Sequence, residues 1–199
     1  TPAGTQTEQR VMKTTQNTNK RSGFTLIEMV GVLAVIAILA ALLVPKIFAA
    51  IQESKYSNTI GSLNSVKAAT MNYFTKNSAF EQDADPIFFD NRLITAGQLE
   101  NQFVAKVGKS WSCNAAPAVA VAGAGAFLKL DGANLKAEGT VVSCKIGEVS
   151  LADAWELSKR IDGKDMSADD AVAADDEGRV VYTAGNNGLT DVYFYIAHK

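Results

Sequence analysis

The stretch Lys20-Arg21-Ser22-Gly23-Phe24-Thr25-Leu26-Ile27-Glu28 marks an abrupt change in the character of the chain. A basic, polar segment ends at the small residue Gly23, and a long apolar run follows it. No residue from Met29 to Pro45 is charged, so Glu28 is the single carboxylate of the apolar run. A run of this length predicts a helix that spans a bilayer. Placing a lone carboxylate in such a helix costs roughly 2.5–3.5 kcal/mol, which predicts a functional role for Glu28.

Charge is unevenly distributed along the 199 residues, whose net charge is −2. The first 23 residues contain four basic side chains and one acidic side chain, so this segment is +3 and the rest of the chain is −5. By the positive-inside rule, a basic segment before an apolar span predicts that residues 1–23 are cytoplasmic and that the remainder lies outside the cytoplasm. The acidic body argues against nucleic acid as a partner.

The leader, residues 1–23, is rich in Gln, Thr and Asn and has no apolar core. A general secretory signal carries its own apolar segment before the cleavage point, whereas here the hydrophobic run follows Gly23. We therefore expect the apolar run to be retained in the mature protein. We also expect the leader to start at Met12, with residues 1–11 being upstream sequence and no part of the fold.

The basic leader, the Gly-Phe-Thr-Leu-Ile-Glu junction and the apolar run together resemble the N-terminal signature of type IV pilins and of the pseudopilins of type II secretion. The resemblance is specific over Lys20–Ala50. It implies that a prepilin peptidase of the inner membrane cleaves after Gly23 and N-methylates Phe24. It also implies that the Glu28 carboxylate pairs with the Phe24 amine of a neighbouring subunit during assembly. The alternative for Glu28 is a side chain that snorkels to the membrane interface.

A long helix followed by a small head is the predicted architecture. Residues 24–51 form the expected membrane-spanning and polymerisation half, in which Gly31 and Pro45 predict weak points and a kink. Residues 52–76 predict an amphipathic half that packs on the head, because apolar side chains recur at helical spacing: Tyr56, Ile60, Leu63, Val66, Tyr73 and Phe74. Residues 77–199 form the expected head. A long helix followed by antiparallel strands predicts an α+β, pilin-like fold.

Within the head, turn residues and apolar alternation predict short elements. A capping-box-like start at Ser150 predicts a short helix that Gly163 ends. Asn186-Asn187-Gly188 predicts the turn of a terminal hairpin. The expected strands are Phe127–Leu130, Thr140–Lys145, Arg179–Ala184 and Asp191–Ala197. Two segments are left open: Ala115–Phe127 is expected to be strand and loop, and Leu93–Phe103 a short helix or a packed loop.

Cys113 and Cys144 are the two cysteines of the chain, and both lie in the part expected outside the cytoplasm. In an oxidising compartment a single pair most simply forms a disulfide; the alternative is two free, buried thiols. Closing this loop would contribute roughly 3–4 kcal/mol in the chain-entropy model.

The acidic segment near the C-terminus offers weak calcium candidates, namely Asp162, Asp165, Asp169 and Asp170. The spacing of an EF-hand loop is absent, which favours a solvated acidic loop. Major pseudopilins often carry a calcium site in a late loop, so the resemblance leaves the calcium alternative open. The only histidine, His198, has no motif context for catalysis. We predict no metal, no cofactor and no enzymatic activity.

The preferred interpretation is a structural subunit, a prepilin that is processed and polymerised into a type IV pilus at the bacterial surface. The alternatives are a pseudopilin of a type II secretion system, which acts as a periplasmic piston, and a minor pilin that binds a ligand. The expected partners are other copies of the chain through the N-terminal helix, the prepilin peptidase and the assembly platform of the pilus or secretion system. The inner membrane holds the precursor before assembly.

Overall fold

The structure is a computed structural model, and it describes residues 23–81, 89–117, 129–130, 133–134, 139–171, 173–185 and 187–199. The predicted leader therefore lies outside the described residues, apart from Gly23. The chain divides between Lys46 and Ile47 into two compact units.

A single helix, α1, runs over Leu26–Asn77 and connects the apolar run to the head. Its apolar half is exposed, and every residue from Gly23 to Ser54 is solvent-accessible in the isolated chain. Burial begins in the amphipathic half, where Thr59, Leu63 and Val66 face the head. Pro45 lies inside the helix. The kink expected at this position and at Gly31 stays a prediction.

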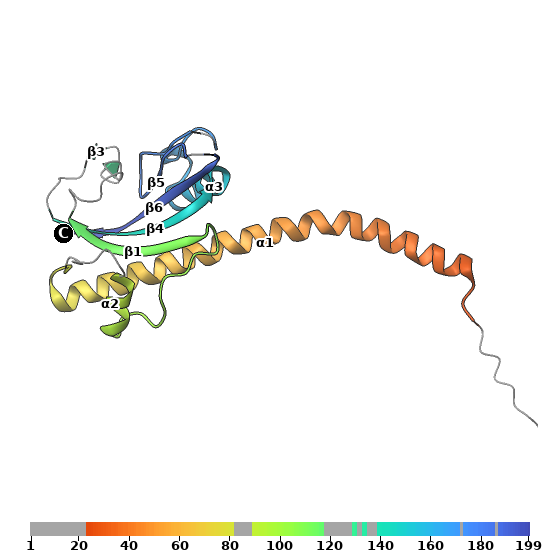
Figure 1. The fold of residues 1–199 in the computed structure, drawn as a ribbon, viewed down its shortest axis with the longest axis horizontal. Coiled ribbons are helices and arrows are strands. Elements are labelled where there is room, and N and C mark those ends of the chain that lie inside the picture. The colour runs from red at the N-terminus through yellow and green to blue at the C-terminus, as the bar shows by residue number, and fades with distance from the viewer. Residues whose placement is uncertain are drawn as a thin grey trace, which may run out of the picture. The chain divides into compact units, whose positions relative to one another are not determined.

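The head is built on a four-stranded antiparallel sheet in the order β1-β4-β6-β5. Figure 1 shows the C-terminal half of α1 running along this sheet, with the short helix α2 beside it. The bounds of the elements are α2 Phe89–Thr95, β1 Ser110–Pro117, β4 Thr140–Ser150, β5 Val180–Tyr182 and β6 Leu189–His198. A separate two-stranded pair joins β2, Lys129–Leu130, to β3, Ala133–Asn134. The α+β, pilin-like fold expected from the sequence is confirmed.

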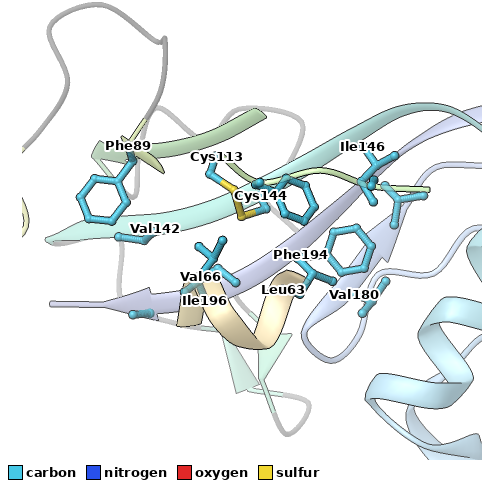
Figure 2. Packing of buried hydrophobic residues seen from close by; sticks show 14 of the residues in the cluster. Leu63, Val66, Phe89, Cys113, Val142, Cys144, Ile146, Val180, Phe194 and Ile196 are labelled. Atoms are coloured by element: carbon cyan, nitrogen blue, oxygen red, sulfur yellow. A yellow bond between two sulfur atoms is a disulfide. The ribbon is translucent and has the colours of Figure 1, made fainter. Parts of the chain in front are cut away.

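The core lies between α1 and the sheet. Figure 2 shows Leu63 and Val66 of α1 near Phe194 and Ile196 of β6. All four side chains belong to one buried cluster, and each is at most 5% exposed. Burying a large aliphatic or aromatic side chain of this kind stabilises a fold by about 1.5–3 kcal/mol. The amphipathic half of α1 therefore holds the head through the stripe of apolar side chains that its sequence predicts.

Helix α3, Leu151–Ile161, starts as its sequence predicts. Ser150 is the N-cap, and its Oγ accepts a hydrogen bond from the Asp153 N–H at 3.1 Å. Ala154 and Leu157 are buried in the core cluster. The helix ends before Gly163, whose φ of 87° lies in the left-handed region that glycine adopts readily. The 3₁₀ turn η2, Lys164–Met166, follows.

Several boundaries differ from the sequence-based expectation. Helix α1 begins at Leu26, two residues after Phe24, because Thr25 caps it. Strand β4 extends to Ser150, past the expected end at Lys145, through a bulge between Ile146 and Val149. Strand β1 begins at Ser110, upstream of the predicted strand, and α2 ends at Thr95, well before Phe103.

Candidate functional site

The junction between leader and helix is organised by a reciprocal pair of residues, Thr25 and Glu28. The Glu28 N–H donates to Thr25 Oγ1 at 3.3 Å, and the Thr25 N–H and hydroxyl both donate to Glu28 Oε2 at 3.3 Å. This is a capping box, in which the N-cap side chain and the N3 side chain each satisfy a backbone donor at the helix start. The negative charge of Glu28 also interacts favourably with the positive, N-terminal end of the helix dipole. Glu28 therefore stabilises the helix N-terminus, a role the sequence analysis did not identify.

The capping box leaves the predicted cleavage point outside the helix. Gly23, Phe24 and Thr25 precede the first residue of α1, and Phe24 is 77% exposed. Exposed, non-helical segments with small residues are the preferred sites of proteolysis, because their backbone is accessible. The Gly23–Phe24 bond thus lies in an exposed segment outside the helix. Cleavage and methylation at these residues stay predictions.

The apolar half of α1 presents a continuous hydrophobic surface. Among the described residues it belongs to one helix that is long and apolar enough, by length and composition, to span a bilayer. Apolar patches of this extent on a soluble monomer are rare and mark a membrane-contacting or protein-contacting surface. The surface begins at Phe24 and Leu26 and continues to Ile51. It therefore requires lipid or other protein around it.

A disulfide joins Cys113 to Cys144. The two residues are directly opposite each other in the register of β1 and β4, and both side chains are fully buried. Figure 2 shows the bond among the apolar side chains of the core. The disulfide predicted from the two cysteines is confirmed, and it ties the edge strand β1 to the central strand β4. Structural disulfides persist in oxidising compartments, which agrees with a head outside the cytoplasm.

The four calcium candidates are not equivalent. Asp162 uses its carboxylate within the fold: Oδ2 accepts the N–H groups of Arg179 and Val180 at 2.9 and 2.7 Å. Its Oδ1 accepts Arg179 Nε at 3.1 Å. Burial raises the pKa of the Asp162 carboxyl, and the bonds from Val180 and Arg179 oppose that rise. Asp162, the C-cap of α3, therefore ties the end of that helix to Arg179 and Val180 at the start of β5.

The remaining candidates are exposed: Asp165 lies in η2, and Asp169 and Asp170 lie in the loop that follows it. Within the described part of the chain, no group of three or more His, Cys, Asp or Glu side chains is arranged to hold a metal ion. The solvated acidic loop stays the prediction for this segment, with calcium binding as its untested alternative.

A polar clamp between α1 and α3 was not anticipated. Tyr56 Oη donates to Asp153 Oδ1 at 2.5 Å, and Arg160 holds both carboxylate oxygens of Glu53 at 2.5 and 2.7 Å. The Arg160 guanidinium also lies over the Tyr56 ring, 4.9 Å from its centroid. Burial, followed by the bond to Asp153, raises the pKa of Tyr56. Sequence periodicity places Tyr56 on the apolar face of the helix, but it does not identify its hydrogen-bond partner Asp153, which is 97 residues away.

Comparison with known families gives one match. Residues 18–44 match the family model described as the prokaryotic N-terminal methylation motif. No curated protein and no solved structure matches the chain. The matched span includes the leader end, the Gly23–Phe24 junction, the capping box and most of the apolar run. The motif is typical of pilin-like structural proteins, which are not enzymes.

The motif and the apolar helix together indicate a membrane-anchored precursor that is processed by a prepilin peptidase and assembles into a pilus-like polymer in the periplasm or outside the cell. The long helix, the antiparallel head and the disulfide agree with that assignment. The chain therefore carries the prepilin-type signature of type IV pilins and type II pseudopilins.

Proposed function

We propose that this chain is the precursor of a type IV pilus subunit. In this proposal the prepilin peptidase cleaves after Gly23 and methylates the new amine of Phe24, and the assembly platform then moves the subunit from the inner membrane into a filament. The match of residues 18–44 to the methylation motif is the observation that carries the proposal. The exposed, non-helical Gly23–Phe24 junction supports it.

The geometry of Glu28 supports a role in docking as well as capping. Both bonds from Thr25 go to Oε2, so within the described chain Oε1 accepts no hydrogen bond. Cleavage would create a cationic amine at Phe24, and methylation of an amine keeps its positive charge. A carboxylate removed from lipid into a filament core needs such a cation, because an unpaired buried charge is strongly destabilising. Oε1 is available to accept the Phe24 amine of a neighbouring subunit.

The first experiment is the intact mass and N-terminal sequence of protein sheared from the cell surface. The expected product begins at Phe24 and is one methyl group heavier than the unmodified chain. Correctly processed protein confined to the envelope would instead favour a pseudopilin or a minor subunit. An uncut chain would contradict the proposal.

A matched pair of glycine variants separates processing from folding. A Cβ added at Gly23 or at Gly31 would meet no atom of the surrounding structure within 4 Å, so both positions have open space beside the backbone in the isolated chain. We expect Gly23→Ile to block cleavage, because a small residue is required before the cut, and Gly31→Ala to be cleaved normally. Equal cleavage of both variants would mean that the cut lies elsewhere.

A further inference from the structure

A groove on the head is lined by cationic side chains around an apolar floor. Lys67 of α1, Arg160 of α3 and Arg179 before β5 line a cavity of about 200 Å³. Its apolar floor includes Ile60 and Ile161, which are half-buried. None of the described residues that line the cavity is a carboxylate. Surfaces of this kind fit an anionic segment that also carries apolar side chains.

The three cations differ in how far they are engaged within the chain. Arg160 is ion-paired with Glu53 and Glu156, and Arg179 is bonded to Asp162. Lys67 is exposed, and among the described residues it has neither a hydrogen bond nor an ion pair. The ammonium of Lys67 is therefore the positive charge of the groove that remains available to another molecule.

The same head carries a segment of the opposite character. Residues 165–178 contain six acidic residues and no basic one. Asp165, Asp169, Asp176 and Glu177 are exposed, and Met166 lies partly exposed between the first two. An acidic loop with an accessible methionine has a charge opposite to that of the groove and an apolar side chain that suits the apolar floor of the groove.

The loop is fastened to α3 and to Tyr182 of its own copy. Trp155 Nε1 donates to the Ala168 carbonyl at 2.8 Å, and Ser158 Oγ donates to Asp175 Oδ2 at 2.5 Å. The backbones of Asp175 and Tyr182 exchange two hydrogen bonds of 2.9 Å. The bonds from Trp155 and Ser158 therefore fix two points of the loop, Ala168 and Asp175, to α3 of its own copy.

We propose that the acidic loop 165–177 of one copy docks in the Lys67 groove of the next copy. This inference rests on the proposed polymerisation of the chain and identifies a contact between heads. Two different surfaces of one chain that complement each other make a head-to-tail contact, and repetition of such a contact builds an open helical fibre. The loop contributes its carboxylates to Lys67 and lays Met166 against the apolar floor.

A zero-length carbodiimide cross-link tests this contact directly, because it joins a lysine amine to a carboxylate in contact with it. Full-length protein labelled with nitrogen-15 and unlabelled protein are reconstituted together into phosphatidylcholine vesicles and treated with the reagent. We expect mixed-isotope links between Lys67 and loop 165–177. Lys76, exposed on the same helix and outside the groove, is the matched control. If mixed-isotope links at Lys67 are absent, or if they are no more frequent than those at Lys76, the inference is wrong.

Charge reversal provides a second readout in cells. We expect Lys67→Glu to lower the yield of sheared filament about tenfold, since like charges facing each other across an interface are strongly unfavourable. Lys76→Glu should leave the yield unchanged. Adding Asp169→Lys to Lys67→Glu should restore most of the yield, whereas a further loss would contradict docking of the loop. The vesicle cross-link needs no filament. If the cross-link is absent while cells make normal filaments, the groove contact alone is refuted. If the cross-link forms in vesicles while cells make no filaments, the proposed pilus is refuted and the contact stands.

Discussion

The Glu28 carboxylate closes back on Thr25, the residue directly after the predicted new N-terminus, and the Thr25 hydroxyl in turn accepts the Glu28 N–H. One carboxylate thus has two separable functions. It caps the helix through its shape and hydrogen-bonding capacity, and it is proposed to dock the subunit through its charge. Glutamine can close a capping box as glutamate does, but it cannot neutralise an amine.

We predict that Glu28→Gln keeps the helix start and loses assembly. The glutamine side chain retains the bond from the Thr25 N–H, while the Phe24 amine of the neighbour is left without a counter-charge. Removing one partner of a buried ion pair costs about 3–5 kcal/mol, which corresponds to a loss of filament yield of about a hundredfold or more. Sheared filament yield and amide hydrogen exchange at Leu26–Met29 measure the two functions separately. Normal filaments from Glu28→Gln would show that the charge is dispensable.

Thr25 supplies the complementary pair of variants. Thr25→Ser preserves the hydroxyl and should preserve the cap, whereas Thr25→Val has nearly the same shape and no acceptor. Losing an N-cap acceptor costs about 1 kcal/mol of helix stability. We expect faster amide exchange over the first turn of α1 in Thr25→Val only. Equal exchange in both variants would mean that the capping box does not form in the membrane.

The disulfide predicts a large stability difference in the head. Cys113 and Cys144 are 31 residues apart and join paired strands in the core. In the chain-entropy model, reopening this loop destabilises the fold by about 3–4 kcal/mol. The double variant Cys113→Ser/Cys144→Ser, measured by chemical denaturation of the full chain in detergent, should unfold at a much lower denaturant concentration than the oxidised protein. Reductant should shift the native protein in the same direction and leave the variant unchanged.

Local sequence rules predicted the parts of the fold that local physics determines. The capping-box-like start at Ser150, the end of α3 at Gly163 and the apolar stripe of Leu63 and Val66 are all set within a few residues. The sequence predicts a strand further along the chain than β1, because Ser110–Pro117 contains Ser, Asn and Pro, which have little β-propensity. Strand β1 forms through its pairing with β4.

Long-range pairing explains the rest of what sequence reasoning missed. The salt bridge between Glu53 and Arg160 spans 107 residues, and no periodicity in either helix reports it. The Thr25–Glu28 box was within reach of the sequence, since threonine followed three residues later by glutamate is a known start signal. The position of Glu28 in an apolar run indicates a functional role, and the same residue also has this local one. A residue in a functional motif can have a second, local role.

The clamp between the two helices predicts that Tyr56→Phe destabilises the head. The phenylalanine ring keeps the packing and the contact with Arg160, and removes the hydroxyl that donates to Asp153 at 2.5 Å. Hydrogen bonds to a charged group contribute about 1.5–3 kcal/mol, and Asp153 keeps its bond from Ser150, so we expect a loss near the lower end. Tyr182→Phe is the control, because the Tyr182 hydroxyl has no hydrogen-bond partner among the described residues. Chemical denaturation measures both, and an unchanged Tyr56→Phe would mean that the clamp is solvated.

The buried carboxyl of Asp175 predicts how stability changes with pH. Burial raises its pKa above the ordinary value of 3.8, although bonds from Ser158 and the Glu177 N–H favour the ionised form. Because the folded-state pKa is the higher one, the fold binds this proton more readily than the unfolded chain does. Stability from this group is therefore present below pH 3.8 and is lost as the pH rises through the folded-state value.

Asp175→Asn removes that dependence, so the free energy of unfolding of the native protein relative to this variant should increase on acidification. Asp162 has a raised pKa from the same cause, and its charge adds to the rise in the Asp175 pKa, so the difference reports Asp175 together with its interaction with Asp162. Asp165→Asn changes an exposed carboxylate of the same loop and should show no such trend. Denaturation of the full chain in detergent between neutral pH and about pH 4 measures the difference. A difference that falls on acidification would mean that the hydrogen bonds from Ser158 and Glu177 outweigh burial and that the Asp175 pKa is lowered.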